Sequence, residues 1–377
     1  MGSKAGGEVL VPFLDWSSHH AEFREKWLED VRRIYDSGVF LRGPHVAEFE
    51  RRFAAYCSSA PKKLFATAVA NGLDALFLSL KALEFRPGSE ILIPGNTFIA
   101  TALAVKNAGY NPVLVPPDVN TYNMDPNRLD DFLSERTCAV IPVHLYGRIC
   151  SMPQIAAWAQ KSNIAVIEDA AQAHGARLNG QMAGSFGLAA AFSFYPGKNL
   201  GALGDAGAVL TADAAFGEKI RRLGNYGSEK KYEHELQGQN SRMDEIQAAF
   251  LVHKLALLQK QLEHRRWIAR VYSEQLPDEL RLPPRDDDQY SSAWHLYVVR
   301  HPQRDRLLDF LDSRGVRCSI HYPRSIDLHQ AFENCNLNRC PVSRQLSREV
   351  MSLPIGPHIE APQLEYIVKQ VRAFFGK

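Results

Sequence analysis

Residues 192–207 read FSFYPGKNLGALGDAG and place a single lysine, Lys198, inside a glycine-rich turn. The aromatic and small residues at 192–195 predict a strand, which ends at the Pro-Gly pair that follows. A P-loop is excluded, because phenylalanine stands five residues before the Gly-Lys pair and asparagine stands after it. The later glycines are spaced GxxGxxG, which also excludes the dinucleotide-binding GxGxxG pattern. The lysine therefore requires another chemical explanation.

The composition is that of an ordinary soluble globular protein, with 377 residues, 45% of them hydrophobic and 23% charged. This length is sufficient for two domains. A net charge of +2 gives no reason to expect nucleic acid or an anionic membrane as a partner. The six cysteines form no CxxC pair, so we expect neither a metal site nor a disulfide framework. Cysteines without such pairing are typical of reduced thiols in a cytoplasmic protein. The start lacks the apolar core of a signal peptide, and no apolar run reaches the about 18 residues of a membrane span.

The first 240 residues predict a sheet covered by helices on both faces. Two amphipathic helices at 22–36 and 45–57 come first, and strand-like and helical segments alternate from residue 64 onward. The strand segments, such as 138–147 and 164–173, are apolar nearly throughout, which is typical of parallel strands buried on both faces. The prediction is an α/β fold with a mostly parallel sheet, whose ligands bind beyond the carboxyl ends of the strands.

The pattern changes after residue 240. Residues 240–276 predict one long helix. The following segments predict a smaller α+β unit in the order strand, helix, strand, at 291–300, 307–316 and 318–323. We therefore expect a large domain at 20–260 and a small C-terminal domain at 261–377, with residues 1–19 packing near the small domain.

Three predicted strand ends carry chemically suggestive residues. Asn71-Gly72 marks a strand-to-helix turn, where Gly72, Leu73 and Asp74 offer backbone N–H groups to an anion such as phosphate, although most helix N-termini bind nothing. Asp169 follows a buried strand, where a carboxylate is costly unless it meets a cation or caps a helix. Lys198 is either a solvated loop lysine or, if partly desolvated, a nucleophile for a carbonyl group.

Together these three features match the requirements of pyridoxal phosphate. Its phosphate group needs a helix N-terminus, its pyridine nitrogen needs a carboxylate that keeps it protonated, and its aldehyde needs a lysine. With this cofactor in mind, the sequence resembles the nucleotide-sugar aminotransferases of the DegT/StrS type, a branch of the fold-type I pyridoxal-phosphate enzymes. The resemblance runs in order along nearly the whole chain, through VPFLDW (11–16), FLRGPHVAEFE (40–50), NGLDAL (71–76), IPGNTFIAT (93–101), VHLYG (143–147), EDAAQAHGA (168–176), FSFYPGKNLGALGDAGAV (192–209), NSRMDEIQAA (240–249) and HYP (321–323).

The resemblance assigns roles to matching positions. It implies that Lys198 is the internal-aldimine lysine and proton shuttle, that Asp169 pairs with the pyridine nitrogen, and that Gln172 lies near the 3-oxygen of the ring. It also implies a homodimer with a shared site, because Asn240 resembles an asparagine that reaches the phosphate from the partner subunit. The remaining implied cofactor contacts are a stacking ring and three phosphate ligands, namely Phe98, Gly72, Leu73 and Ser193.

The family's activity implies a ping-pong transamination in which L-glutamate leaves its amine on the cofactor and a nucleotide-linked keto-sugar takes it. Residues 192–209 look more like the branch that converts a dTDP-3-keto-6-deoxyhexose to a dTDP-3-amino-3,6-dideoxyhexose. A UDP-linked 3-keto-sugar or a 4-keto-sugar remains the alternative. Segments that line the sugar pocket in relatives contain residues that could equally be packed aromatics or surface charges, namely Tyr195, Tyr226, Lys231, His321 and Tyr322.

Individual residues also bear on one expected ion pair and on two alternative functions. Arg242 is expected to form a structural ion pair with Asp244 or Glu245 rather than to bind substrate. A related class that removes the sugar 3-hydroxyl has histidine at the lysine position, so Lys198 argues against it. A non-catalytic regulatory or binding protein on the same fold is the alternative of a different class; the joint presence of Lys198, Asp169, Gln172 and Ser193 argues against that reading.

Overall fold

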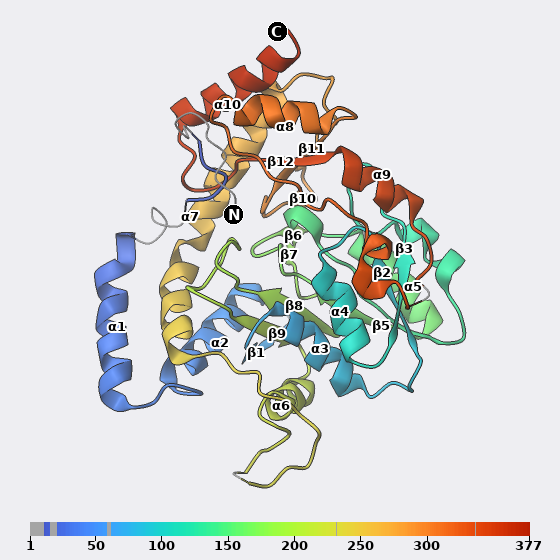
Figure 1. Cartoon of the computed structure of the whole chain (residues 1–377). Helices are drawn as coiled ribbons and strands as arrows, with labels where there is room; N and C mark the ends of the chain where they lie inside the picture. The colour runs from blue at the N-terminus through green and yellow to red at the C-terminus, as the bar shows by residue number, and fades with distance from the viewer. Residues whose placement is uncertain (1–10, 16–20, 59–61, 231, 336) are drawn as a thin grey trace.

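The centre of the molecule is a seven-stranded sheet in the order β1-β9-β8-β5-β4-β2-β3. In this computed structural model, the described residues are 11–15, 21–58, 62–230, 232–335 and 337–377 (Figure 1). Only β9 runs antiparallel to its neighbours, so the predicted mostly parallel α/β sheet is confirmed. The strands are β1 (Phe65–Val69), β2 (Glu90–Pro94), β3 (Asn111–Val115), β4 (Thr137–Val140), β5 (Ala165–Asp169), β8 (Ala189–Ser193) and β9 (Gly207–Thr211).

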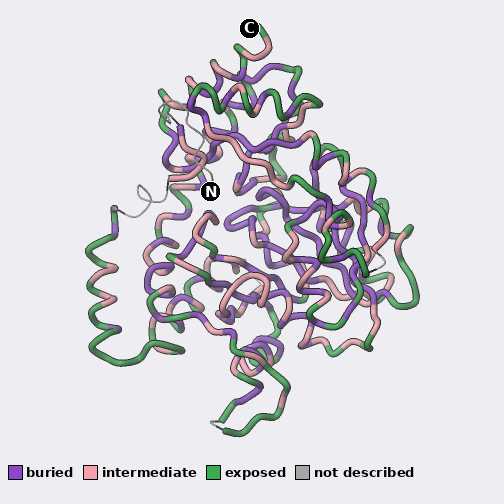
Figure 2. The backbone as a smooth tube through the Cα atoms, in the orientation of Figure 1, coloured by how far each residue is buried: buried purple, intermediate pink, exposed green. Residues whose placement is uncertain are grey.

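Helices bury both faces of this sheet, because successive side chains of each strand point to opposite faces. Leu92 and Val140 pack in the core under α2, α5 and α7, whereas Ile91 and Ala139 pack in the core under α3, α4 and α6. The strands accordingly run through the buried interior in Figure 2. These helices are α2 (Pro44–Cys57), α5 (Met152–Ser162), α7 (Glu245–Gln275), α3 (Gly72–Leu83), α4 (Ile99–Asn107) and α6 (Ala214–Leu223).

The 31-residue helix α7 connects two hydrophobic cores. Leu258 and Leu262 belong to the core beneath the sheet, whereas Ile268 and Tyr272 belong to a third core. That third core packs α7 against C-terminal elements, which are β11 (Tyr297–Arg300), α8 (Arg304–Asp312), β12 (Val350–Leu353) and α10 (Ala361–Phe374). The remaining longer helices are α1 (Arg24–Ser37), which packs along α7, and α9 (Pro341–Glu349), and a small sheet joins β6 (Arg177–Leu178), β7 (Gln181–Met182) and β10 (Tyr290–Ser291).

Two predicted strands are wrong in extent. The predicted strand 318–323 forms only a single bridge, Ser319 with Ser352, because β12 occupies the place beside β11. The predicted strand 138–147 ends at Val140, and a turn follows in which Tyr146 has φ of 60°. Proline at 142 has no N–H for a strand ladder, which favours this early end.

The described part of the N-terminal segment lies against the C-terminal unit. The Val11 N–H donates to Gly315 O at 2.9 Å, and the Arg317 N–H donates to Val11 O at 3.0 Å. The Val11 side chain is buried in the third core. Residues 1–10 and 16–19 of the predicted N-terminal segment lie outside the described residues.

Candidate active site

Asp169 and Lys198 lie at the same edge of the sheet. Strands β5 and β8 are parallel neighbours, and Asp169 is the register partner of Ala191. Strand β8 ends two residues later at Ser193, and the chain turns there toward Lys198. The strands that end at Asp169 and before Lys198 are therefore neighbours, as the sequence-based prediction requires.

The turn that carries Lys198 is closed by backbone hydrogen bonds. The Lys198 N–H donates to Tyr195 O at 2.8 Å, and the Ala202 N–H donates to Phe194 O at 2.7 Å. A Cβ atom on Gly201 would lie 2.3 Å from the Pro196 carbonyl oxygen, so no larger residue fits there. The glycine thus allows the turn to be this tight and holds the lysine at the sheet edge.

A cavity of about 370 Å³ opens beside this turn. Eight of the thirteen predicted site residues line it, namely Phe98, Asp169, Gln172, Ser193, Tyr195, Lys198, His321 and Tyr322. The cavity is also lined by residues that were not predicted, which include Phe13, Thr97, Thr101, Asp205 and His295. All of these except His295 fall inside quoted family motifs, so the motifs could have signalled them.

The two central ionisable groups influence one another. Burial raises the pKa of Asp169, while hydrogen bonds from Thr101 Oγ1 at 2.9 Å and the Ala171 N–H at 3.2 Å, and the charge of Lys198, act in the opposite direction. Desolvation lowers the pKa of Lys198 to about 8, although the negative charge of Asp169 opposes this decrease. A sizeable fraction of neutral lysine near pH 8 is what attack on a carbonyl requires.

The polar wall of the cavity is fixed by Gln172. Its Oε1 accepts the Tyr146 N–H at 2.6 Å, which orients the amide group. Its Nε2 then donates to the Tyr322 hydroxyl at 2.9 Å. The Tyr322 ring lies 5.5 Å from the ring of Phe98, which is 53% exposed and thus open to a flat ligand.

The N-terminus of α3, where the sequence predicts an anion site, lies beside Ser193. A Cβ atom on Gly72 would lie 2.6 Å from the Ser193 Cβ, so helix and strand end touch here. The Asp74 N–H is already taken by the Asn71 side chain at 2.8 Å, so its predicted availability to an anion is wrong. Gly72 and Leu73 are the first two residues of α3, and their N–H groups form no hydrogen bond within the helix.

Among the described residues, Tyr226 and Asn240 do not line this cavity. Tyr226 and Asn240 lie on the segment between α6 and α7, which projects from the rest of the chain (Figure 1). The Tyr226 N–H donates to Gln239 O at 2.9 Å, and its ring faces the Arg242 guanidinium at 5.5 Å. Tyr226 thus contacts its own segment within a single chain, and its role toward the sugar stays a prediction. Lys231 lies outside the described residues.

The predicted ion pair of Arg242 is also wrong. Arg242 Nη1 donates to Asn225 Oδ1 at 3.2 Å. The Glu245 carboxylate instead accepts the N–H groups of Gly43, His45 and Val46 at 2.8 to 3.0 Å. It therefore satisfies the N-terminus of α2, where a negative charge is favourable.

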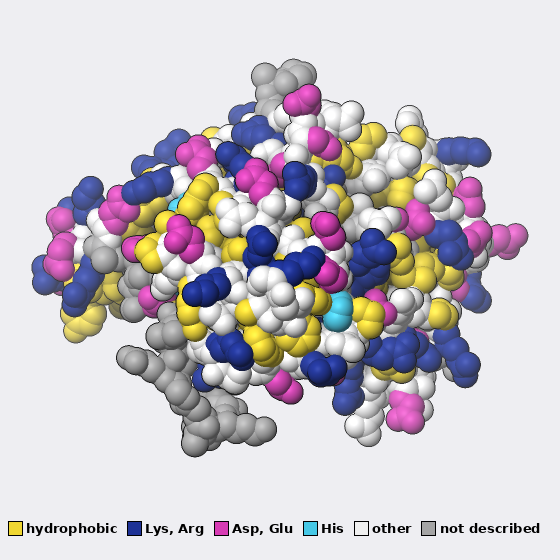
Figure 3. All heavy atoms as spheres, turned by 90° about the horizontal axis from the view of Figure 1, so that it is seen from above, with side chains coloured by type: hydrophobic (Ala, Val, Ile, Leu, Met, Phe, Trp, Pro, Cys, Tyr) yellow, Lys and Arg dark blue, Asp and Glu magenta, His cyan; other side chains and the backbone are white. Residues whose placement is uncertain are grey.

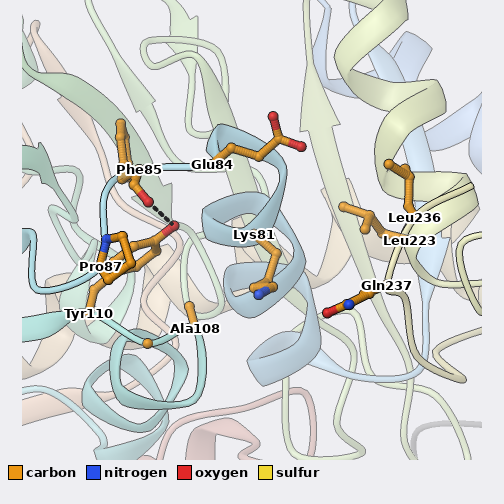
Figure 4. Close-up of a pocket in the computed structure, with 10 residues that line it drawn as sticks. Lys81, Glu84, Phe85, Pro87, Ala108, Tyr110, Leu223, Leu236 and Gln237 are labelled. Carbon is orange, nitrogen blue, oxygen red and sulfur yellow. Dashed lines mark hydrogen bonds between the residues drawn. The ribbon is translucent and has the colours of Figure 1, made fainter.

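A second hollow, of about 340 Å³, lies at the opposite edge of the sheet, where parallel strands begin. Lys81, Phe85, Tyr110 and Leu236 are among its lining residues (Figure 4). It contains no predicted site residue, and ligands of such sheets bind at the carboxyl ends of the strands.

Basic and acidic side chains are interspersed on the face of the molecule seen in Figure 3. Within the described residues, no helix is long and apolar enough to span a membrane.

Known proteins resemble the chain along most of its length. It is 43% identical over 366 residues to the erythromycin biosynthesis sensory transduction protein EryC1 of Saccharopolyspora erythraea, which covers 96% of this chain and 99% of that protein. It is also 43% identical over 366 residues to the dTDP-3-amino-3,6-dideoxy-alpha-D-galactopyranose transaminase of Aneurinibacillus thermoaerophilus. That match covers 97% of this chain and 99% of the transaminase.

The crystal structure of S. venezuelae DesV in complex with a ketimine intermediate matches with a TM-score of 0.93. Its sequence is 41% identical, and the match covers 97% of this chain and 99% of that one. The model of the DegT/DnrJ/EryC1/StrS aminotransferase family matches residues 21–372. The chain therefore belongs to the DegT/DnrJ/EryC1/StrS aminotransferase family.

Proposed function

We propose that the protein transfers the amino group of L-glutamate to C3 of a dTDP-linked 3-keto-6-deoxyhexose, with pyridoxal phosphate as cofactor. The observation that carries the proposal is the pairing of Lys198, whose pKa is lowered to about 8, with the buried Asp169 in one cavity. The relative from Aneurinibacillus thermoaerophilus, named as a transaminase of a dTDP-3-amino-3,6-dideoxyhexose, supports the sugar class.

The residues fit the cofactor. Gly72 allows the α3 N-terminus to approach Ser193 closely, so that a phosphate group there would accept hydrogen bonds from the first N–H groups of the helix and from the Ser193 hydroxyl. Asp169 is buried, and because an unpaired buried carboxylate is costly, a protonated nitrogen beside it would stabilise its charge. The exposed face of Phe98 suits stacking on a pyridine ring. When bound, pyridoxal phosphate would supply a carbonyl for reversible bonding to Lys198 and a ring that stores the electron pair released at the substrate carbon.

The chain's own groups would then manage protons and orientation. Neutral Lys198 Nζ would remove the proton from the substrate carbon and return it at the cofactor carbon as a general base and acid. Ionised Asp169 would keep the pyridine nitrogen protonated, and Gln172 would donate toward the ring oxygen. Tyr195, His321 and Tyr322 would contact the sugar; burial lowers the pKa of His321 to about 4, so this ring would act uncharged.

We also propose that the active form is a homodimer in which Asn240, and with it Tyr226 on the same segment, reaches the partner's cavity. The projecting segment that carries them supports this arrangement (Figure 1). An apolar surface beside it gives further support, since Phe40 is 55% exposed and its carbonyl oxygen accepts the Glu245 N–H at the start of α7. Such exposed apolar side chains are typical of subunit interfaces.

We further propose that residues 20–260 and 261–377 act as a large and a small domain, with residues 1–19 beside the small domain. The change of core along α7 between Leu262 and Ile268 supports a boundary in this region. We place the activity in the cytoplasm, in keeping with the six unpaired cysteines.

The decisive experiment is a visible absorption spectrum of the purified protein before and after excess L-glutamate, with Lys198→Ala beside it and Lys219→Ala as a surface-lysine control. We expect the cofactor band in the wild type and the control to be lost on adding glutamate. Incubation with dTDP-linked and UDP-linked 3-keto-sugars and with a 4-keto-sugar should then restore it fastest with the dTDP 3-keto compound. A wild type that shows no imine band after incubation with pyridoxal phosphate and removal of the excess would refute the aminotransferase proposal and favour a binding protein.

A further inference from the structure

Two buried threonines at the start of α4 lead to the Asp169 carboxylate: Thr97 just precedes the helix, and Thr101 lies in its first turn. Thr101 is 1% exposed, and its Oγ1 lies 2.9 Å from Asp169 Oδ2. Thr97 is 2% exposed, and its Oγ1 lies 2.9 Å from Thr101 Oγ1. The three side chains therefore form a continuous hydrogen-bonded chain at the wall of the Lys198 cavity.

The direction of this chain follows from the chemistry of its groups. An ionised carboxylate only accepts hydrogen bonds, and a hydroxyl has a single hydrogen to donate. Thr101 must therefore donate its hydrogen to Asp169, and the oxygen of Thr101 then accepts the hydrogen of Thr97. Both hydroxyl dipoles point toward the negative charge, and consecutive hydrogen bonds of this kind strengthen one another.

The two threonine hydroxyls stabilise the ionised form of Asp169 and not its neutral form. Burial favours the neutral acid, and the Thr101 hydrogen bond acts most strongly among the groups that oppose burial. The only other described donor to this carboxylate is the Ala171 N–H, at 3.2 Å. Phe98, at the start of the same helix, carries the ring exposed in the cavity, so α4 positions both the ring and the hydroxyls.

We infer that Thr97 and Thr101 are positioning residues that keep Asp169 ionised toward the pyridine nitrogen of the cofactor. The inference rests on the proposed function. Without the Thr101 hydroxyl the carboxylate becomes more basic, so the proton shared between Asp169 and the ring nitrogen shifts toward Asp169. The ring would then carry less positive charge, so Lys198 Nζ, when bonded to the carbonyl carbon of the cofactor, would keep its proton to a higher pH.

The test is a pH titration of the visible cofactor band in the intact holoenzyme. We expect Thr101→Val to raise the titration midpoint by about one pH unit, the order of one charge-assisted hydrogen bond. Thr101→Ser, which keeps the hydroxyl, should restore the wild-type midpoint. Thr97→Val should raise the midpoint by less, because it removes only the second hydroxyl of the chain.

The matched control is Thr67→Val. Thr67 is also buried and donates its hydroxyl hydrogen to a carbonyl oxygen, that of Gly217, at 3.1 Å, away from Asp169. It should leave the midpoint unchanged. Wild-type midpoints in Thr101→Val, or in Thr97→Val if Thr101→Val does not fold, would overturn the inference while the wild-type band and its response to glutamate leave the proposed function intact.

Discussion

Replacing Lys254 by methionine is expected to remove a pH-dependent part of the stability of the fold. Lys254 lies in α7, is 1% exposed, and donates one hydrogen bond, to the carbonyl oxygen of Gly201 at 3.0 Å. Burial, and to a smaller extent the nearby Arg265, lowers its pKa from 10.5 to about 7. The unfolded chain therefore keeps this proton to a higher pH than the folded chain does.

The magnitude follows from linkage. Stability rises with pH wherever the unfolded state binds more protons, which for Lys254 is the window between about pH 7 and pH 10.5. The buried charge costs roughly 4 kcal/mol at pH 7 and about 2 kcal/mol at pH 9, since one pKa unit corresponds to about 1.4 kcal/mol. The wild type should therefore gain about 2 kcal/mol from this group between pH 7 and pH 9.

Methionine is similar in length but carries neither the charge nor the donor. It leaves the Gly201 carbonyl unsatisfied, at a cost of about 1–3 kcal/mol. At pH 7 this cost is smaller than that of the buried charge, so Lys254→Met should be more stable than the wild type by about 1–3 kcal/mol. By pH 9 the two should be nearly equal.

The assay is urea unfolding of both holoenzymes at pH 7, 8 and 9, followed by circular dichroism. Leu258→Met, on the same buried side of α7, is the control for packing changes and should follow the pH profile of the wild type. Parallel pH profiles for Lys254→Met and the wild type would refute the reasoning, because they would mean that Lys254 does not titrate in this window.

Three further perturbations test the site and its support. Asp169→Asn should lower kcat at least about 100-fold with little loss of fold, because it removes the charge that holds the ring nitrogen protonated; steady-state kinetics and a thermal melt check both parts. Gly201→Ala should abolish cofactor retention, since its Cβ would meet the Pro196 carbonyl at 2.3 Å, and an unchanged visible band after dialysis would contradict this. Glu168→Gln should lower the urea midpoint by the equivalent of about 2–3 kcal/mol, because Glu168 accepts three backbone N–H groups and the His144 Nε2–H; a shift under about 0.5 kcal/mol would count against it.

Predictions from the sequence are wrong where a side chain or strand has several possible partners in the fold. The sequence predicts an ion pair of Arg242 with Asp244 or Glu245, but Arg242 donates to Asn225, and Glu245 accepts three N–H groups at the N-terminus of α2, about 200 residues earlier in the chain. Residues 318–323 have a strand-like pattern, yet β12 is the segment that pairs with β11. Local patterns do not reveal such competition, because it is decided by distant segments that fold into the same place.

The residue pattern alone predicts the alternation of strands and helices, and it predicts that Asp169 and Lys198 meet if their strands are neighbours, a condition that the β5–β8 pairing fulfils. Each follows from local rules: apolar strands make a parallel sheet, and the ends of adjacent parallel strands share one edge. Only the tertiary structure decided that Thr101 donates to Asp169 and that Lys254 holds the Gly201 carbonyl. These contacts join residues 68 and 53 positions apart, and no periodicity encodes them, because side-chain hydrogen bonds depend on how whole elements pack together.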